Sequence, residues 1–126
     1  MNLTLVLQGL IKVFGAAALL LGLAFWLGYA RPLTQLHVGL GIGLVLCVWA
    51  VSWIAWRNGR AGLAAFGLIC GALSWILGVT QGAIAPGPYH WVVEAAHLAV
   101  GAITVVAGIR IAAAVSLRGV SARASS

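Results

Sequence analysis

The chain has 126 residues, of which 63% are hydrophobic and only 6% are charged. A soluble domain carries roughly a quarter charged residues, and a disordered chain combines low hydrophobicity with high charge, so this composition excludes both classes. Seven Lys and Arg residues oppose a single acid, Glu94. Because the basic residues lie between or after apolar runs, and not on a face interleaved with exposed aromatic residues, nucleic acid is a poor candidate partner. The composition indicates an integral membrane protein.

Four apolar segments are long enough to cross the roughly 30 Å hydrocarbon core of a bilayer, which takes about 20 helical residues. Proline and glycine punctuate the joints between these segments, and all the connections are short. Short connections make consecutive helices antiparallel neighbours. The sequence therefore predicts an all-α, integral membrane four-helix bundle with antiparallel up-down topology. The predicted spans are approximately 13–29, 33–56, 61–83 and 89–109.

The distribution of positive charge predicts the orientation of this bundle. With four spans, the N-terminus, the loop between the second and third spans and the C-terminus share one side. That side holds six basic residues, whereas the opposite side holds only Arg31. Positive charge marks the cytoplasmic side, so we expect both termini in the cytoplasm and the protein in the cell membrane. One transmembrane domain covers 1–116, and 117–126 forms a short basic polar tail.

The N-terminal residues allow two interpretations. Residues 2–11 are compatible with an amphipathic stretch at the cytoplasmic interface, before the first span. A signal peptide is the alternative, because residues 28–30 read Gly-Tyr-Ala and resemble a small-x-small cleavage site. The N-terminal region of a signal peptide is positively charged, whereas the corresponding region here is apolar. This difference favours the first interpretation.

The two cysteines, Cys47 and Cys70, both lie inside apolar runs without CxxC spacing. This placement fits neither a zinc site nor a disulfide framework. We expect two free thiols that pack as small hydrophobic side chains.

Three histidines lie in or beside the predicted spans, and an ionisable residue within a membrane is a functional candidate because it is costly to bury there. His37 lies about 6 Å inside the second span, and His97 about 9 Å inside the fourth, at a helical rise of 1.5 Å per residue. Both spans are entered from the outer side, so the two imidazoles have similar depth. His90 lies at the mouth of the fourth span, near water.

Each deep histidine is followed four residues later by glycine, His37 by Gly41 and His97 by Gly101. Residues four apart share a helix face, so each glycine would clear space beside a ligand histidine for a flat macrocycle. We therefore predict one haem with two axial ligands, His37 and His97, and with Gly41 and Gly101 against the ring. Bacteriochlorophyll takes one axial histidine per ring, so the pair favours haem, and the lack of a CxxCH motif favours haem b.

The alternative is that the deep histidines only form hydrogen bonds within the bundle. Their partners would be each other, or the side chains of Thr34, Gln35 and Gln81. Such a protein would be a cofactor-free membrane subunit or assembly factor.

Part of the sequence resembles a known family. Residues 76–82, Ile-Leu-Gly-Val-Thr-Gln-Gly, then Pro86 and the run Ala-His-Leu-Ala around His97, resemble the third and fourth helices of a haem A synthase four-helix half. Each half of that family places ligand histidines on its second and fourth helices, which implies the same role for His37 and His97. The resemblance covers the last three spans and implies a half-size relative or a similarly built b-type cytochrome.

The chain departs from that family where the chemistry is performed. The catalytic half of the family carries Glu-x-x-His-Arg on its second helix, whereas here the residues around His37 read Thr-Gln-Leu-His-Val. The spacing Glu-x-x-His recurs at Glu94 and His97, but on the fourth span and followed by Leu98. The comparison therefore favours haem binding over haem A synthesis, which remains a further alternative.

Glu94 and two residues at the outer mouth complete the candidate site. Glu94 has two interpretations, a carboxylate that handles protons or quinol, or an interfacial carboxylate paired with Arg31 or His90. Arg31 and His90 lie where haem propionates would reach water, and we assign them to cofactor binding on that ground.

Two axial imidazoles leave no open position on the iron, which suits electron transfer. The predicted function is electron transfer by a haem b protein of the lipid bilayer, alone or within a larger redox complex. Quinone or other membrane redox subunits are the expected partners, and a homo-oligomer is compatible with the sequence. Whether the protein is also an enzyme stays open, because Glu94 is the only carboxylate that a haem-modifying reaction could use.

Overall fold

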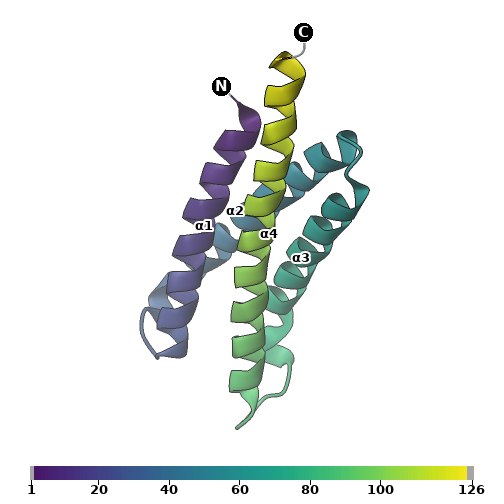
Figure 1. The fold of residues 1–126 in the computed structure, drawn as a ribbon. Coiled ribbons are helices and arrows are strands. Elements are labelled where there is room, and N and C mark those ends of the chain that lie inside the picture. The colour runs from purple at the N-terminus through teal and green to yellow at the C-terminus, as the bar shows by residue number, and fades with distance from the viewer. Residues whose placement is uncertain (1, 125–126) are drawn as a thin grey trace.

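The computed structural model describes residues 2–124, with side-chain surroundings for 2–116. Within these residues the fold consists of helices without any strand, as Figure 1 shows. Each of the four long helices is long and apolar enough to cross a membrane. The elements are α1 (Leu3–Trp26), the short 3-10 helix η1 (Arg31–Leu33), α2 (Thr34–Arg57), α3 (Ala61–Thr80), the 3-10 helix η2 (Gln81–Ala83) and α4 (His90–Ala124).

The helices form an antiparallel bundle, so the predicted all-α four-helix architecture is confirmed. Helix α1 packs against α2 and α4, and α3 packs against the same two helices. Helices α2 and α4 also contact each other across the bundle. Both chain ends lie at one end of the molecule in Figure 1, and the loops α1–α2 and α3–α4 lie at the other. This arrangement places the two histidine-bearing helices diagonally across one bundle.

Glycine with positive φ ends two of the helices and allows the sharp reversals of the chain. After α1, Gly28 has φ of 87°, and the amide of Tyr29 donates to the carbonyl of Ala24 at 2.8 Å. After α2, Gly59 has φ of 72°, and the next amide returns to the carbonyl of Ala55 at 2.9 Å. Both ends have the hydrogen-bond pattern of a Schellman motif, which glycine favours because it lacks a Cβ.

The closely packed core occupies the half of the bundle that holds the chain ends. Its centre includes Ile11, Val48, Val51 and Ile111, none of which is more than 1% exposed. Small residues bring the helices together there: a Cβ added at Gly108 would lie 2.8 Å from Cγ2 of Val48. Glycine at helix contacts permits this close approach of backbones. The opposite half of the bundle is less closely filled.

Two helices are longer than the predicted spans. Helix α1 begins at Leu3, and the side chain of Asn2 caps it by accepting a hydrogen bond from the Thr4 amide, so 3–11 belong to the first long helix. Helix α4 continues past residue 109 to Ala124, because the exposed Arg110 is a good helix former and does not interrupt the backbone. The polar surface predicted for the tail, 117–126, lies outside the residues whose side chains are described.

The prediction of two free, buried thiols is confirmed for Cys47 and Cys70. The backbone carbonyl of Cys70 accepts a hydrogen bond from the hydroxyl of Thr104 at 3.1 Å, and that hydroxyl also bonds to the hydroxyl of Ser74 at 2.8 Å. These bonds join α3 to α4 in the middle of the bundle.

Candidate functional site

A cavity of about 360 Å³ lies among all four helices, in the half of the bundle away from the chain ends. Its volume falls within the range of small-molecule sites, about 300 to 1,000 Å³. Most of its wall is apolar, and the polar side chains are few. These polar side chains belong to Thr34, His37, Ser74, Gln81, Glu94 and His97.

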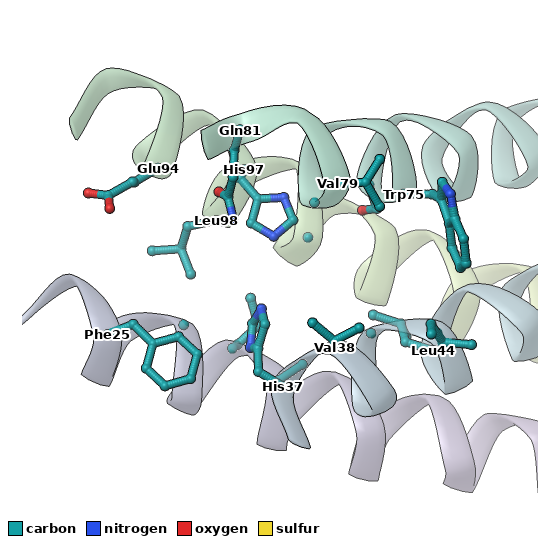
Figure 2. Close-up of a pocket in the computed structure, with 18 of the residues that line it drawn as sticks. Phe25, His37, Val38, Leu44, Trp75, Val79, Gln81, Glu94, His97 and Leu98 are labelled. Carbon is teal, nitrogen blue, oxygen red and sulfur yellow. The ribbon is translucent and has the colours of Figure 1, made fainter. Parts of the chain in front are cut away.

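The two deep histidines face one another across this cavity. His37 extends from α2 and His97 from α4, and Figure 2 shows the two rings directed into the space between these helices. Their ring centroids are 6.3 Å apart and their planes are inclined by 68°. The structure thus brings together the two residues that the sequence predicts as a ligand pair.

Both imidazoles have a buried nitrogen without a partner. Nδ1 of His37 and Nδ1 of His97 form no hydrogen bond with any described residue. The backbone of Ala18 approaches the His37 ring, but without hydrogen-bond geometry to Nδ1. Buried polar atoms in proteins are nearly always paired, so these two nitrogens are exceptions among the described residues.

The hydrogen bonds that the alternative interpretation requires at Nδ1 are missing from the described residues. The hydroxyl of Thr34 donates to the backbone carbonyl of Arg31 at 2.7 Å. Gln81 lines the cavity without pairing with either Nδ1, and Gln35 lies outside the wall. The bundle therefore leaves Nδ1 of both histidines unpaired.

The predicted glycines Gly41 and Gly101 both line the cavity. A Cβ added at Gly41 would meet no described atom within 4 Å, and one added at Gly101 would meet only Cδ2 of Leu19, at 3.6 Å. Neither glycine is therefore needed for close helix packing. Their lack of a side chain enlarges the cavity instead, as the sequence predicts.

Two further glycines adjoin the histidine rings, and sequence reasoning missed them. A Cβ at Gly22 on α1 would lie 3.4 Å from Cε1 of His37, and one at Gly78 on α3 would lie 3.4 Å from Cε1 of His97. A sequence signal exists, because α1 and α3 share the pattern Gly-x6-Gly, which ends at these two residues.

The two helical hairpins therefore form the site in the same way. In each hairpin the first helix supplies a glycine beside the imidazole, and the second supplies the histidine and a glycine four residues later. The hairpins α1–α2 and α3–α4 therefore contribute equivalent residues to the cavity. Phe25 is an exception to this equivalence. Its ring packs edge-on against the ring of His37, with 5.3 Å between the centroids, and no described residue has the same position at His97.

The remaining predicted site residues divide into two groups. Glu94 lines the cavity, whereas Arg31 and His90 do not. Nε2 of His90 lies 3.9 Å from Oε1 of Glu94, and these side chains are 31% and 43% exposed. Nδ1 of His90 donates to the carbonyl of Ile84 at 3.2 Å. His90 thus has partners near the mouth, in contrast with the two deep histidines.

The two imidazoles could bind a metal ion whose other ligands come from a bound cofactor. Within the described residues, no three His, Cys, Asp or Glu side chains converge on a common point. An imidazole nitrogen binds a metal at about 2.0 Å, so two rings whose centroids are 6.3 Å apart could hold one metal ion between them. The residues present therefore fit a metallated tetrapyrrole, whose ring supplies the other nitrogens.

Comparison of the chain with family models, with curated proteins and with solved structures gives no match.

Proposed function

We propose that this protein is a membrane cytochrome that binds one haem b and transfers electrons. The observation that carries the proposal is the pair His37 and His97, two imidazoles from α2 and α4 whose ring centroids lie 6.3 Å apart and which line one cavity. A haem bound there supplies one-electron redox chemistry at its iron. The protein supplies axial ligands, orientation and an apolar surrounding.

Each part of the cavity wall has a role in this proposal. His37 and His97 would hold the iron, and ligation by two imidazoles would favour electron transfer over oxygen chemistry. Gly41 and Gly101 leave room for the ring, and the edge-on Phe25 restricts rotation of His37. The mainly apolar wall separates the ring from water, and such burial is one of the determinants of redox potential.

The setting of the protein belongs to the same proposal. Four apolar helices place it in a lipid bilayer. We propose the cell membrane, with both termini in the cytoplasm and the histidine pair toward the outer leaflet. Its partners would be a quinone or other membrane redox subunits, and a homo-oligomer would fit the exposed apolar helix faces.

An enzyme of haem modification is the second candidate, consistent with the resemblance to one half of haem A synthase. Glu94 favours it, because this carboxylate lines the same cavity three residues before His97. A modification reaction would change the mass of the extracted pigment, whereas electron transfer would leave it as haem b.

An absorption spectrum of purified protein, with pyridine haemochrome analysis and mass measurement of the extracted pigment, tests these alternatives. We expect a low-spin Soret and α-band spectrum with one unmodified haem b per chain. A modified haem would favour the enzyme. Protein without any pigment after haem-replete expression would contradict haem binding and favour a cofactor-free subunit or assembly factor.

A further inference from the structure

Apart from the two histidines, most polar side chains of the cavity wall lie at one end. Ser74 is the exception, and its hydroxyl is already bonded to the hydroxyl of Thr104 at 2.8 Å. Trp26 ends α1, Thr34 begins α2, Gln81 begins η2, and Glu94 lies in the second turn of α4, so all four lie toward the loops α1–α2 and α3–α4. The opposite end of the cavity is lined by Leu19, Leu44, Val45 and Trp75. Figure 2 shows Glu94 on one side of the histidine pair, with Phe25 and Leu98 nearer to the rings, and Leu44 and Trp75 on the other side, whereas Gln81 lies beside His97.

This separation matches the asymmetry of protoporphyrin, which has two carboxylates on one edge and apolar substituents on the other. A carboxylate buried without hydrogen-bond donors is very costly, so the propionate edge has to face the polar end. His37 lies only three residues after the start of α2, about 4.5 Å along the helix axis. The polar end is therefore within reach of the edge of a ring ligated at His37.

The polar side chains at this end differ in the hydrogen bonds they can offer. The hydroxyl hydrogen of Thr34 is already donated to Arg31, so that side chain offers only acceptor lone pairs. The amide of Gln81 has two N–H donors and lines the cavity. Glu94, when ionised, is an acceptor only, and its charge repels another carboxylate.

We propose, on the basis of the haem site above, that the propionate edge lies at this polar end. Gln81 donates a hydrogen bond to one propionate, and Glu94 opposes the propionates by like-charge repulsion. Gln81 is thus a positioning residue that sequence reasoning considered only as a hydrogen-bond partner for histidine. It takes the role that the sequence assigns to Arg31 and His90, neither of which lines the cavity.

The test compares ferric protoporphyrin IX with its dimethyl ester, in which both propionates are uncharged. Full-length apo-protein in detergent is titrated with each pigment, and the low-spin Soret band gives the dissociation constant. The variants are Gln81→Leu and Glu94→Gln. Gln35→Leu is the matched control, because Gln35 lies on an exposed face near the same end and does not line the cavity.

Gln81→Leu should weaken binding of the free acid by about tenfold, since a hydrogen bond to a charged group is lost, and change binding of the ester by less than about twofold. Glu94→Gln should strengthen binding of the free acid and leave the ester unchanged, because it removes the repulsion. Gln35→Leu should alter neither constant.

Two results would overturn this orientation while leaving the haem site intact. One is an equal loss of both pigments in Gln81→Leu, and the other is weaker binding of the free acid in Glu94→Gln. Wild-type protein that binds neither pigment would instead overturn the proposed function itself.

Discussion

At the scale of single residues, Gly41 offers a steric test of the cavity. In Gly41→Leu the new side chain would extend into the cavity. If haem binds there as proposed, we expect a large loss of haem occupancy, measured as the ratio of Soret to protein absorbance. Helix α2 should remain intact, because leucine is a better helix former than glycine by roughly 0.5 to 1 kcal/mol. Circular dichroism checks that point.

Gly39→Leu is the control for this substitution. Gly39 lies on the same helix, and a Cβ there also meets no described atom within 4 Å, but the residue does not line the cavity. Its haem occupancy should match that of the wild type. Equal occupancy in both variants would show that Gly41 does not face a bound ring.

The histidine pair could be selected from the sequence, whereas much of its surroundings could not. Depth along the spans distinguishes His37 and His97 from His90. Within the described residues, His90 pairs with Ile84 and Glu94, whereas Nδ1 of each deep histidine has no hydrogen-bond partner. The Gly-x6-Gly pattern of α1 distinguishes Gly22, but its place beside His37 arises from contact between two helices, which spacing along one helix does not predict.

At the scale of elements, the hydrophobic spans predict how many helices there are, whereas helix lengths depend on local chemistry. The early start of α1 depends on one capping bond from Asn2. The late end of α4 depends on the ability of a helix to carry Arg110 on an exposed face. The length of an apolar segment indicates which part of a helix can lie in lipid. The helix itself can extend beyond that segment at either end.

Close helix contacts in the packed half provide a test that is independent of any cofactor. A Cβ at Gly67 on α3 would overlap the Ser52 side chain and lie 2.7 Å from Cδ1 of Ile111. Gly67→Val should therefore destabilise the bundle by about 1 to 3 kcal/mol through overpacking. Thermal unfolding in detergent measures the effect.

Gly62→Val is the matched control on the same helix, because a Cβ there meets no described atom within 4 Å. It introduces the same β-branched side chain and the same change in helix propensity. If the two variants unfold at the same temperature, the close contact of α3 with α2 and α4 does not contribute as the structure indicates.

At the scale of the whole molecule, the bundle has a closely packed half and a half that holds a cavity. The half with the chain ends is closely packed and holds Ile11, Val48 and Ile111 without exposed surface above 1%. The half with the short loops α1–α2 and α3–α4 holds the cavity and the histidine pair. Hydropathy alone cannot distinguish these halves, because a cavity for an apolar ligand and a packed core have the same composition.

The predicted orientation applies to the whole molecule and follows from six basic residues against one. We expect a single cysteine introduced at Tyr89, an exposed residue of the loop α3–α4, to react with a membrane-impermeant maleimide added outside intact cells. A cysteine at Asn58, in the loop α2–α3, should react only after the membrane is permeabilised. Cys47 and Cys70 are replaced by alanine in both cases, which their free, buried state permits. The opposite labelling pattern would show that the bundle is inverted.

The central claim, that His37 and His97 together bind one haem iron, is tested most directly by electron paramagnetic resonance of the oxidised protein. We predict a low-spin ferric signal of the bis-imidazole type in the wild type and in His90→Ala. That signal should be lost in His37→Ala and in His97→Ala, each of which removes one axial ligand. A bis-imidazole signal that persists in His37→Ala or in His97→Ala would contradict this ligand assignment. Loss of the signal in His90→Ala would contradict it as well.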